Sequence, residues 1–180
     1  MSPHSNSVLE EFFFYSLESS VQEQSLVLSD EIKHYLLNLL LSRRQELPYD
    51  GMTTLTELYL SAREEEYRFR KIDCFKKMGD ISITKVGIFP GSFNRTMKNE
   101  YYRNMGILGY KETYLCSNNQ IYHDLSINYD LCVDAIHGVN ILSMKNDIIK
   151  LYNFWKKTES RAAKKRLGKL GFLEIGEILE

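Results

Sequence analysis

Apolar residues recur along this chain at steps of three and four, the spacing that places them on one side of an α-helix. The clearest stretch covers residues 30–45, where the spaced residues are Ile32, Tyr35, Leu36, Leu39 and Leu40. Only three prolines and ten glycines interrupt the 180 residues, so the chain has few turns. A hydrophobic content of 43% is ordinary for a globular protein. These features predict an all-α fold.

Start and stop signals set approximate helix boundaries. Ser7 with Glu10, and Thr54 with Glu57, have the spacing of a capping box, and Gly171 is well placed to end the last helix. The expected helices cover residues 8–22, 30–45, 54–89, 97–115, 120–142, 146–157 and 160–169. Whether the third breaks near residue 64 and the fifth kinks at Gly138 stays open. The first helix is expected to bury Leu9, Phe12, Phe13 and Leu17.

We therefore expect residues 1–180 to form a single compact multi-helix domain of about six to eight helices. Residues 1–6 are expected to be disordered, and residues 172–180 to form a loose tail.

The segment that ends at Phe89 allows two interpretations. Its β-branched residues would suit a strand over Ile81–Ile88. Helical steps of three and four continue, however, through Ile72, Phe75, Gly79, Ser82, Val86 and Phe89. Because the chain offers no second strand to pair with, we predict a helix that ends before Pro90. Gly79 would then let another helix approach closely.

Composition limits the classes of function. A net charge of −1 argues against a dedicated nucleic-acid-binding protein. The one basic run, Ser160–Arg166, is expected to be a solvated helix face, with an acidic partner or nucleic acid as the less favoured alternative. Cys74, Cys116 and Cys132 show no metal-binding spacing and are expected in the core, which suits a reducing cytoplasm.

The sequence also carries no signal for a membrane. The N-terminus lacks the basic region of a signal peptide, and the longest apolar run, Tyr35–Leu41, is too short to span a bilayer. We predict a cytoplasmic protein with no membrane association.

Two pairs of residues have a spacing that metal ligands use. Glu31 with His34, and Asp134 with His137, each place a carboxylate and an imidazole on one helical face. Two such pairs on facing helices are half of a ferritin-like di-metal site. The glutamates that would complete that site are missing, and Glu31 also suits the first turn of its helix. The alternative is that these residues are exposed or cap helices, and we expect no cofactor.

A second candidate site lies around the Pro90 loop. Arg95 with Tyr101 and Tyr102 could bind an anion or small ligand. A guanidinium can donate two hydrogen bonds to one carboxylate or phosphate, and tyrosine hydroxyls can supply further hydrogen bonds. Asp80 could pair with Arg95 or be exposed. The alternative is that Arg95 binds loop carbonyls while the tyrosines pack with their hydroxyls outward.

Two blocks of the sequence resemble a known family. The first block contains Gly79-Asp80, Gly87-Ile88-Phe89-Pro90, Arg95, Tyr101-Tyr102, Met105-Gly106 and Tyr110. The second contains Leu151-Tyr152, Trp155, Thr158, Ser160 and Ala163. Together they resemble a family of uncharacterised bacterial cytoplasmic proteins that are predicted to be all helical. The resemblance covers about residues 28–172 and implies a bacterial, soluble, helical domain, without an activity or functional residues.

These patterns favour a non-enzymatic helical protein-interaction module, an adaptor or chaperone-like subunit. Twelve tyrosines support this hypothesis, because tyrosine is enriched at interfaces. We expect the partner to be another protein or a second copy in a dimer. The alternative is a small-ligand or metal-binding helical protein that uses the sites described above. This alternative includes the case in which the protein is an enzyme. Nucleic-acid binding through the basic run ranks last.

Overall fold

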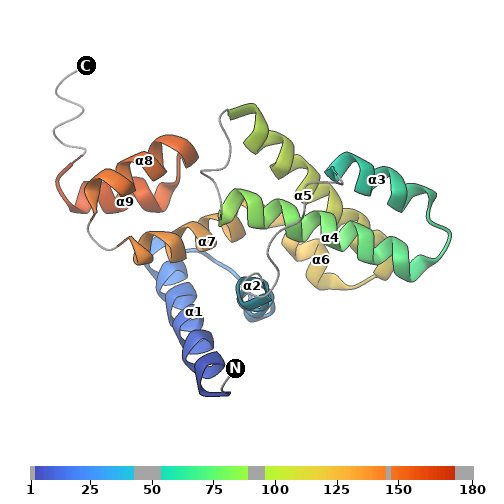
Figure 1. Cartoon of the computed structure of the whole chain (residues 1–180), viewed down its shortest axis with the longest axis horizontal. Coiled ribbons are helices and arrows are strands. Elements are labelled where there is room, and N and C mark those ends of the chain that lie inside the picture. The colour runs from blue at the N-terminus through green and yellow to red at the C-terminus, as the bar shows by residue number, and fades with distance from the viewer. Residues whose placement is uncertain (1–2, 43–53, 89–95, 145–146, 173–180) are drawn as a thin grey trace.

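A computed structural model describes residues 3–42, 54–88, 96–144 and 147–172, which form nine α-helices and no strand (Figure 1). The helices are α1 (Pro3–Gln24), α2 (Asp30–Ser42), α3 (Leu55–Glu64), α4 (Arg68–Gly87), α5 (Thr96–Ser117), α6 (Gln120–Ile127), α7 (Tyr129–Ser143), α8 (Ile148–Thr158) and α9 (Arg161–Lys169). The predicted all-α class is confirmed, with one helix more than the predicted maximum. None of the described helices is long and apolar enough to cross a membrane.

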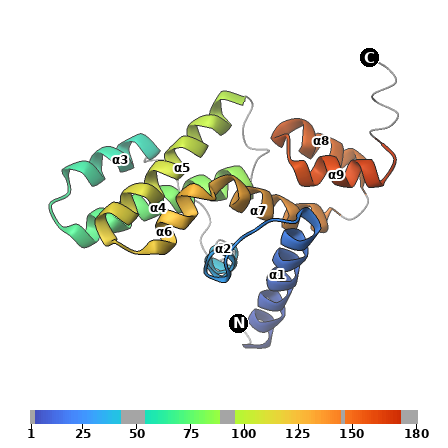
Figure 2. The same ribbon diagram turned by 180° about the vertical axis from the view of Figure 1, so that it is seen from behind.

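The helices form an elongated molecule with α3 at one end and the α8–α9 pair at the other (Figures 1 and 2). Helices α4 and α5 pack along each other, with α3 against α4 and α6 against α5. Helix α7 contacts α1, α2, α4 and α9, and so joins the two ends of the molecule. The N-terminal half of α1 projects away from the other helices.

The main core lies between α2, α4, α5, α6 and α7. Helix α2 is central to this core, because its apolar side is buried at Ile32, Leu36, Leu37, Leu39 and Leu40. A second core joins the end of α7 to α8 and α9, through Ile141, Leu151, Phe154, Ala162, Ala163 and Leu167. The α8–α9 pair therefore holds its own apolar contacts and is attached to the rest mainly through α7 and α1.

Helices α4 and α5 approach closely where two glycines meet. A Cβ atom added to Gly109 would lie 2.7 Å from the backbone nitrogen of Gly79 and 2.8 Å from the carbonyl oxygen of Phe75. A Cβ atom on Gly79 would lie 2.6 Å from the ring of Tyr110. The expected close approach at Gly79 is confirmed. The strand alternative is wrong, because residues 81–87 continue α4 and Ile88 caps it.

Several predicted helix ends are also confirmed. Thr54 forms the expected capping box with Glu57. The predicted start of α2 at residue 30 is also observed, and the preceding Ser29 accepts a hydrogen bond from the backbone of Ile32. Gly171 ends α9 with a φ of 74°, and Phe172 N donates to Leu167 O, as in a Schellman motif.

Other boundaries differ from the prediction. Helix α1 begins at Pro3 rather than after Ser7. The expected helix over 54–89 is interrupted after Glu64 by extended backbone at Glu65 and Tyr67. The helix expected over 120–142 breaks at Asn128, whose side chain donates to the carbonyl of Asp124 at 2.9 Å. Gly138 lies inside α7, where it allows the close approach of α1.

We expect Gly109→Ala to lower the free energy of unfolding by about 1–3 kcal/mol, because its methyl group meets backbone atoms that cannot rotate away. Gly168→Ala is the matched control, since a Cβ atom there meets nothing within 4 Å. The control should raise stability by up to about 1 kcal/mol through higher helix propensity. Urea unfolding of both variants measures this difference, and equal stabilities would contradict the described contact.

Candidate functional site

Asp80 is a predicted site residue that the structure places in the main core. Its side chain lies on α4 and the residue is 8% exposed. The hydroxyls of Tyr35 and Tyr110 donate to its Oδ1 at 2.6 and 3.0 Å. The Lys76 ammonium, one helical turn earlier, donates to its Oδ2 at 2.9 Å. Both carboxylate oxygens are therefore engaged by side chains of the protein itself.

The tyrosines around this carboxylate form a contiguous aromatic group. The rings of Tyr35 and Tyr110 meet edge to face, and Tyr122 packs against both. Burial, reinforced by the charge of Asp80, raises the pKa of Tyr35 and Tyr110, so both hydroxyls stay protonated and act as donors. Burial alone would lower the pKa of Lys76, but the negative charge of Asp80 and its hydrogen bond have the larger effect, so the pKa of Lys76 is raised. The group is suited to hold α2, α4 and α5 together rather than to exchange protons near neutral pH.

The other predicted ligand-binding residues do not join Asp80. Tyr101 is partly exposed, and its hydroxyl lies 2.9 Å from Thr56 Oγ1. Tyr102 packs against Tyr101 and the apolar cluster under α3, and burial raises its pKa. Arg95 lies outside the described residues. The contacts of Asp80 thus come from Tyr35, Lys76 and Tyr110 instead.

The two predicted metal-binding pairs differ in their surroundings. Glu31 and His34 are exposed on α2, whereas Asp134 is half-buried and His137 is buried on α7. His137 Nε2 lies 3.1 Å from the carbonyl oxygen of Val86, an acceptor, so this nitrogen carries the proton. In the part of the chain that the structure describes, no three His, Cys, Asp or Glu side chains come together to hold a metal ion.

The described cysteines are free thiols in apolar surroundings. Cys132 is buried, while Cys74 and Cys116 are half-buried. Burial raises the pKa of Cys132 to about 12 and also raises that of Cys74. A thiol with a raised pKa is a poor nucleophile at neutral pH, which fits the expectation of a packing role.

An open groove of about 670 Å³ lies between the start of α5 and the α8–α9 pair. Residues of α7 also line it. Asn99, Glu100 and Arg103 line it from α5, and Asp130, Asp134 and His137 from α7. The end of α8 supplies Lys156 and Lys157, the link to α9 supplies Glu159, and Arg161 begins α9. Arg103 is already paired with Asp130, since its Nε lies 2.6 Å from Oδ1 and its Nη2 contacts Oδ2.

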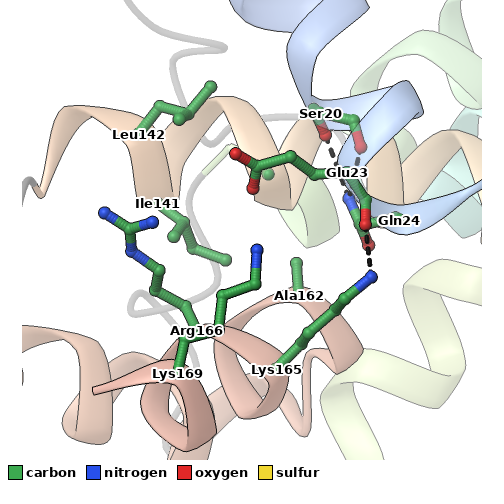
Figure 3. Close-up of a pocket in the computed structure, with 10 residues that line it drawn as sticks. Ser20, Glu23, Gln24, Ile141, Leu142, Ala162, Lys165, Arg166 and Lys169 are labelled. Carbon is green, nitrogen blue, oxygen red and sulfur yellow. Dashed lines mark hydrogen bonds between the residues drawn. The ribbon is translucent and has the colours of Figure 1, made fainter.

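A smaller cavity of about 50 Å³ lies between α1, α7 and α9 (Figure 3). Lys165, Arg166 and Lys169 line it from α9, opposite Glu23 and Gln24 of α1. Lys165 donates to the Glu23 carbonyl near the end of α1, where a cation is favourable. Part of the basic run thus closes the contact between α9 and α1, and the cavity has room for only a few water molecules.

The third feature is an apolar stripe on the projecting part of α1. Val8, Phe12 and Tyr15 are 67%, 49% and 68% exposed, at the i, i+4 and i+7 positions of one helical face. The prediction that Phe12 is buried is therefore wrong. The opposite face, with Phe13, Leu17 and Ser20, packs on the core, so Phe12 is turned toward solvent.

Comparisons with protein-family models, with curated proteins and with solved structures find no match to this chain.

We expect Asp80→Ala to lower the free energy of unfolding by about 3 kcal/mol, because two buried hydroxyls and an ammonium lose their acceptor. Tyr35→Phe removes one donor only and should cost about 1 kcal/mol. Asp73→Ala, at an exposed position on the same helix, is the control and should change stability by less than about 0.5 kcal/mol. Urea unfolding tests this order, and an Asp80 variant as stable as the Asp73 variant would refute it.

We expect His137 to remain neutral well below the usual histidine range. Burial lowers its pKa from 6.5 to about 4, although the hydrogen bond to Val86 partly opposes this shift. The unfolded chain binds a proton near the ordinary pKa and the folded chain only near the lowered one. Stability should therefore fall as the pH drops through this window. Titration of the imidazole ¹⁵N shifts by NMR measures the folded pKa, and a midpoint above 6 would contradict the described burial.

Proposed function

We propose that this protein is a non-enzymatic interaction module whose helix α1 docks into an apolar groove of a partner protein. The exposed stripe of Val8, Phe12 and Tyr15 on the projecting helix carries the proposal, because large apolar side chains that share an exposed face often mark interaction sites (Figure 1). The i, i+4, i+7 spacing is the one by which amphipathic helices anchor in grooves. Phenylalanine and tyrosine also supply much of the energy at protein interfaces.

The attachment of α1 supports this use of the helix. Its C-terminal half is fixed to α7, where Ser20 Oγ donates to the Ala135 carbonyl at 2.7 Å and Gln24 Nε2 donates to the Asp134 carbonyl at 3.0 Å. Lys33 of α2 pairs with Glu18 at 2.9 Å. The exposed half is thus held in a defined direction, which lowers the entropy cost of docking.

The charges on the exposed half favour a partner that differs from the chain itself. Glu10 and Glu11 are exposed beside the stripe. Two copies of α1 packed face to face would bring these carboxylates together, which is unfavourable. A groove with basic residues at its rim fits both the apolar stripe and the adjacent negative charges. The proposed partner is therefore a different protein with a basic, apolar groove.

The state of Asp80 is consistent with a non-enzymatic role. Its carboxylate is the most buried acidic group among the described residues, but Tyr35, Tyr110 and Lys76 occupy its oxygens. A general base or ligand-binding carboxylate needs a free oxygen within reach of its target. This geometry therefore supports a structural use of Asp80.

Photo-crosslinking in cells tests the proposal directly. We expect p-benzoylphenylalanine at position 12 or 15 to give one dominant adduct with a different protein. Position 69 is the matched control, because Phe69 is an aromatic residue on α4 that is as exposed as Tyr15. Adducts identical to those from position 69, or adducts only with a second copy of the chain, would overturn the proposal.

The captured partner then allows a quantitative test with purified proteins. Phe12→Ser with Tyr15→Ser should weaken binding at least about 30-fold, since two aromatic anchors contribute about 1 kcal/mol or more each. Phe69→Ser should leave the affinity unchanged. Equal affinities for the double variant and wild type would show that the stripe is not the docking surface.

A further inference from the structure

The α8–α9 pair at one end of the molecule (Figures 1 and 2) is strongly basic, although the chain as a whole is not. Residues 147–172 contain eight Lys or Arg and two Asp or Glu, a net charge of +6. Because the whole chain has a net charge of −1, all its other residues together have a net charge of −7. The net charge that argued against nucleic-acid binding is therefore an average over regions of opposite charge.

Every exposed side chain of α9 is a cation. Arg161, Lys164, Lys165 and Lys169 are exposed, and their spacing of i, i+3, i+4 and i+8 places them on one side of the helix. We call these four residues the basic face of α9. The opposite side is apolar and buried in the second core. Gly168 is also exposed, and a Cβ atom there would meet nothing within 4 Å, so the middle of the basic face is open to a large partner.

The protein itself engages only part of this face. Lys165 donates to a backbone carbonyl near the end of α1. Burial raises the pKa of Asp134 in the groove, and the charge of Arg161 partly opposes that rise, so these two groups interact. Among the residues that the structure describes, no carboxylate forms a salt bridge with Lys164 or Lys169. At least two ammonium groups therefore remain for an anionic partner.

The shape and composition of the basic face distinguish between classes of anion. Residues 161–169 extend over about 12 Å at 1.5 Å per residue, and a nucleic-acid duplex presents several phosphates over that length. Helix α9 contains no aromatic residue on which the bases of a single strand could stack. Its apolar side is buried, so it has no apolar surface to insert into a lipid bilayer. A duplex thus fits better than a single strand or a membrane.

From these features we infer that the basic face of α9 binds a nucleic-acid duplex through its phosphates. An α-helix fits the major groove of DNA, and lysine ammonium groups bind phosphates as point charges. Lys156 and Lys157 are exposed at the end of α8 and add positive charge that attracts the duplex to this end of the molecule. The surface is separate from the stripe of α1, so the inference does not depend on the proposed docking function.

Fluorescence anisotropy with the full chain and a labelled DNA duplex tests the inference. We expect saturable, micromolar binding in about 50 mM KCl and about 40-fold weaker binding in about 200 mM KCl, because neutralising about three phosphates releases their counterions. No saturable binding at the lower salt concentration, or an affinity that does not change with salt, would overturn the inference. Tighter binding to the corresponding single strand, or to phosphatidylserine vesicles, would also overturn it.

Paired substitutions show whether α9 makes the contact. Lys164→Gln with Lys169→Gln should weaken duplex binding at least about tenfold and make its salt dependence less steep, since two phosphate contacts are lost. Lys77→Gln with Lys111→Gln is the matched control, because these exposed residues of α4 and α5 remove the same net charge elsewhere. An equal loss of affinity in both double variants would show that only the net charge matters and would refute the assignment to α9.

A charge added at Gly168 gives an independent test. The space around this position is open, so both Gly168→Glu and Gly168→Gln should fold. The glutamate should repel the phosphates and weaken duplex binding at least about tenfold relative to the glutamine, which has the same shape without the charge. Equal affinities of the two variants would place the duplex on another surface.

Discussion

Gly79 on α4 and Gly109 on α5 bring the backbones of these two helices into direct contact, and the main core is arranged around that point. The absence of a side chain at Gly79 leaves room for the ring of Tyr110, which packs directly against it. The Tyr110 hydroxyl then reaches Asp80, the next residue along α4. Tyr35 brings α2 to the same carboxylate. A backbone contact that only glycine permits therefore allows one buried charge to connect three helices.

The ends of the molecule are built differently from this centre. Helix α1 is fixed to α7 by its C-terminal half, where Ser20 lies against Gly138, and its N-terminal half projects away from the other helices (Figure 1). The α8–α9 pair has its own small core and reaches the rest through α7 and the Lys165 contact with α1. These limited attachments leave the stripe of α1 exposed and the groove beside α5 open. The stripe and the groove therefore both lie where packing against the core stops.

Local rules explain which parts of the fold could be predicted. The stripe of α2 and the capping box at Thr54 depend only on residues within one or two turns, and both are confirmed. The break at Asn128 differs from the prediction, because asparagine also occurs inside helices and neither proline nor glycine marks this position. The burial of Phe12 was also wrong, since the periodicity gives an apolar face but not the length of the helix that a neighbour covers.

The candidate sites also combine contacts between residues close in sequence, which can be predicted, with contacts between distant residues, which cannot. The four-residue spacing of Lys76 and Asp80 is a sequence signal for their pair, although the sequence analysis considered only a pair with Arg95 or an exposed Asp80. Tyr35 and Tyr110 could not be assigned as partners of Asp80, because they lie 45 and 30 residues away along the chain. The spacing of Asp134 and His137 was visible in the sequence, but not the buried, unpaired nitrogen of the imidazole.

The sequence by itself therefore determined that this chain is helical and where most of its helices begin and end, because those properties depend on hydrogen bonds and side chains within a few residues. The tertiary structure alone decided that Asp80 is paired with Lys76 and hydrogen-bonded by two tyrosines, that Phe12 faces solvent and that an open groove lies beside α5. Each of these outcomes depends on which helices meet and at what distance. That is set by the close contacts at Gly79, Gly109 and Gly138, which involve residues far apart in the chain.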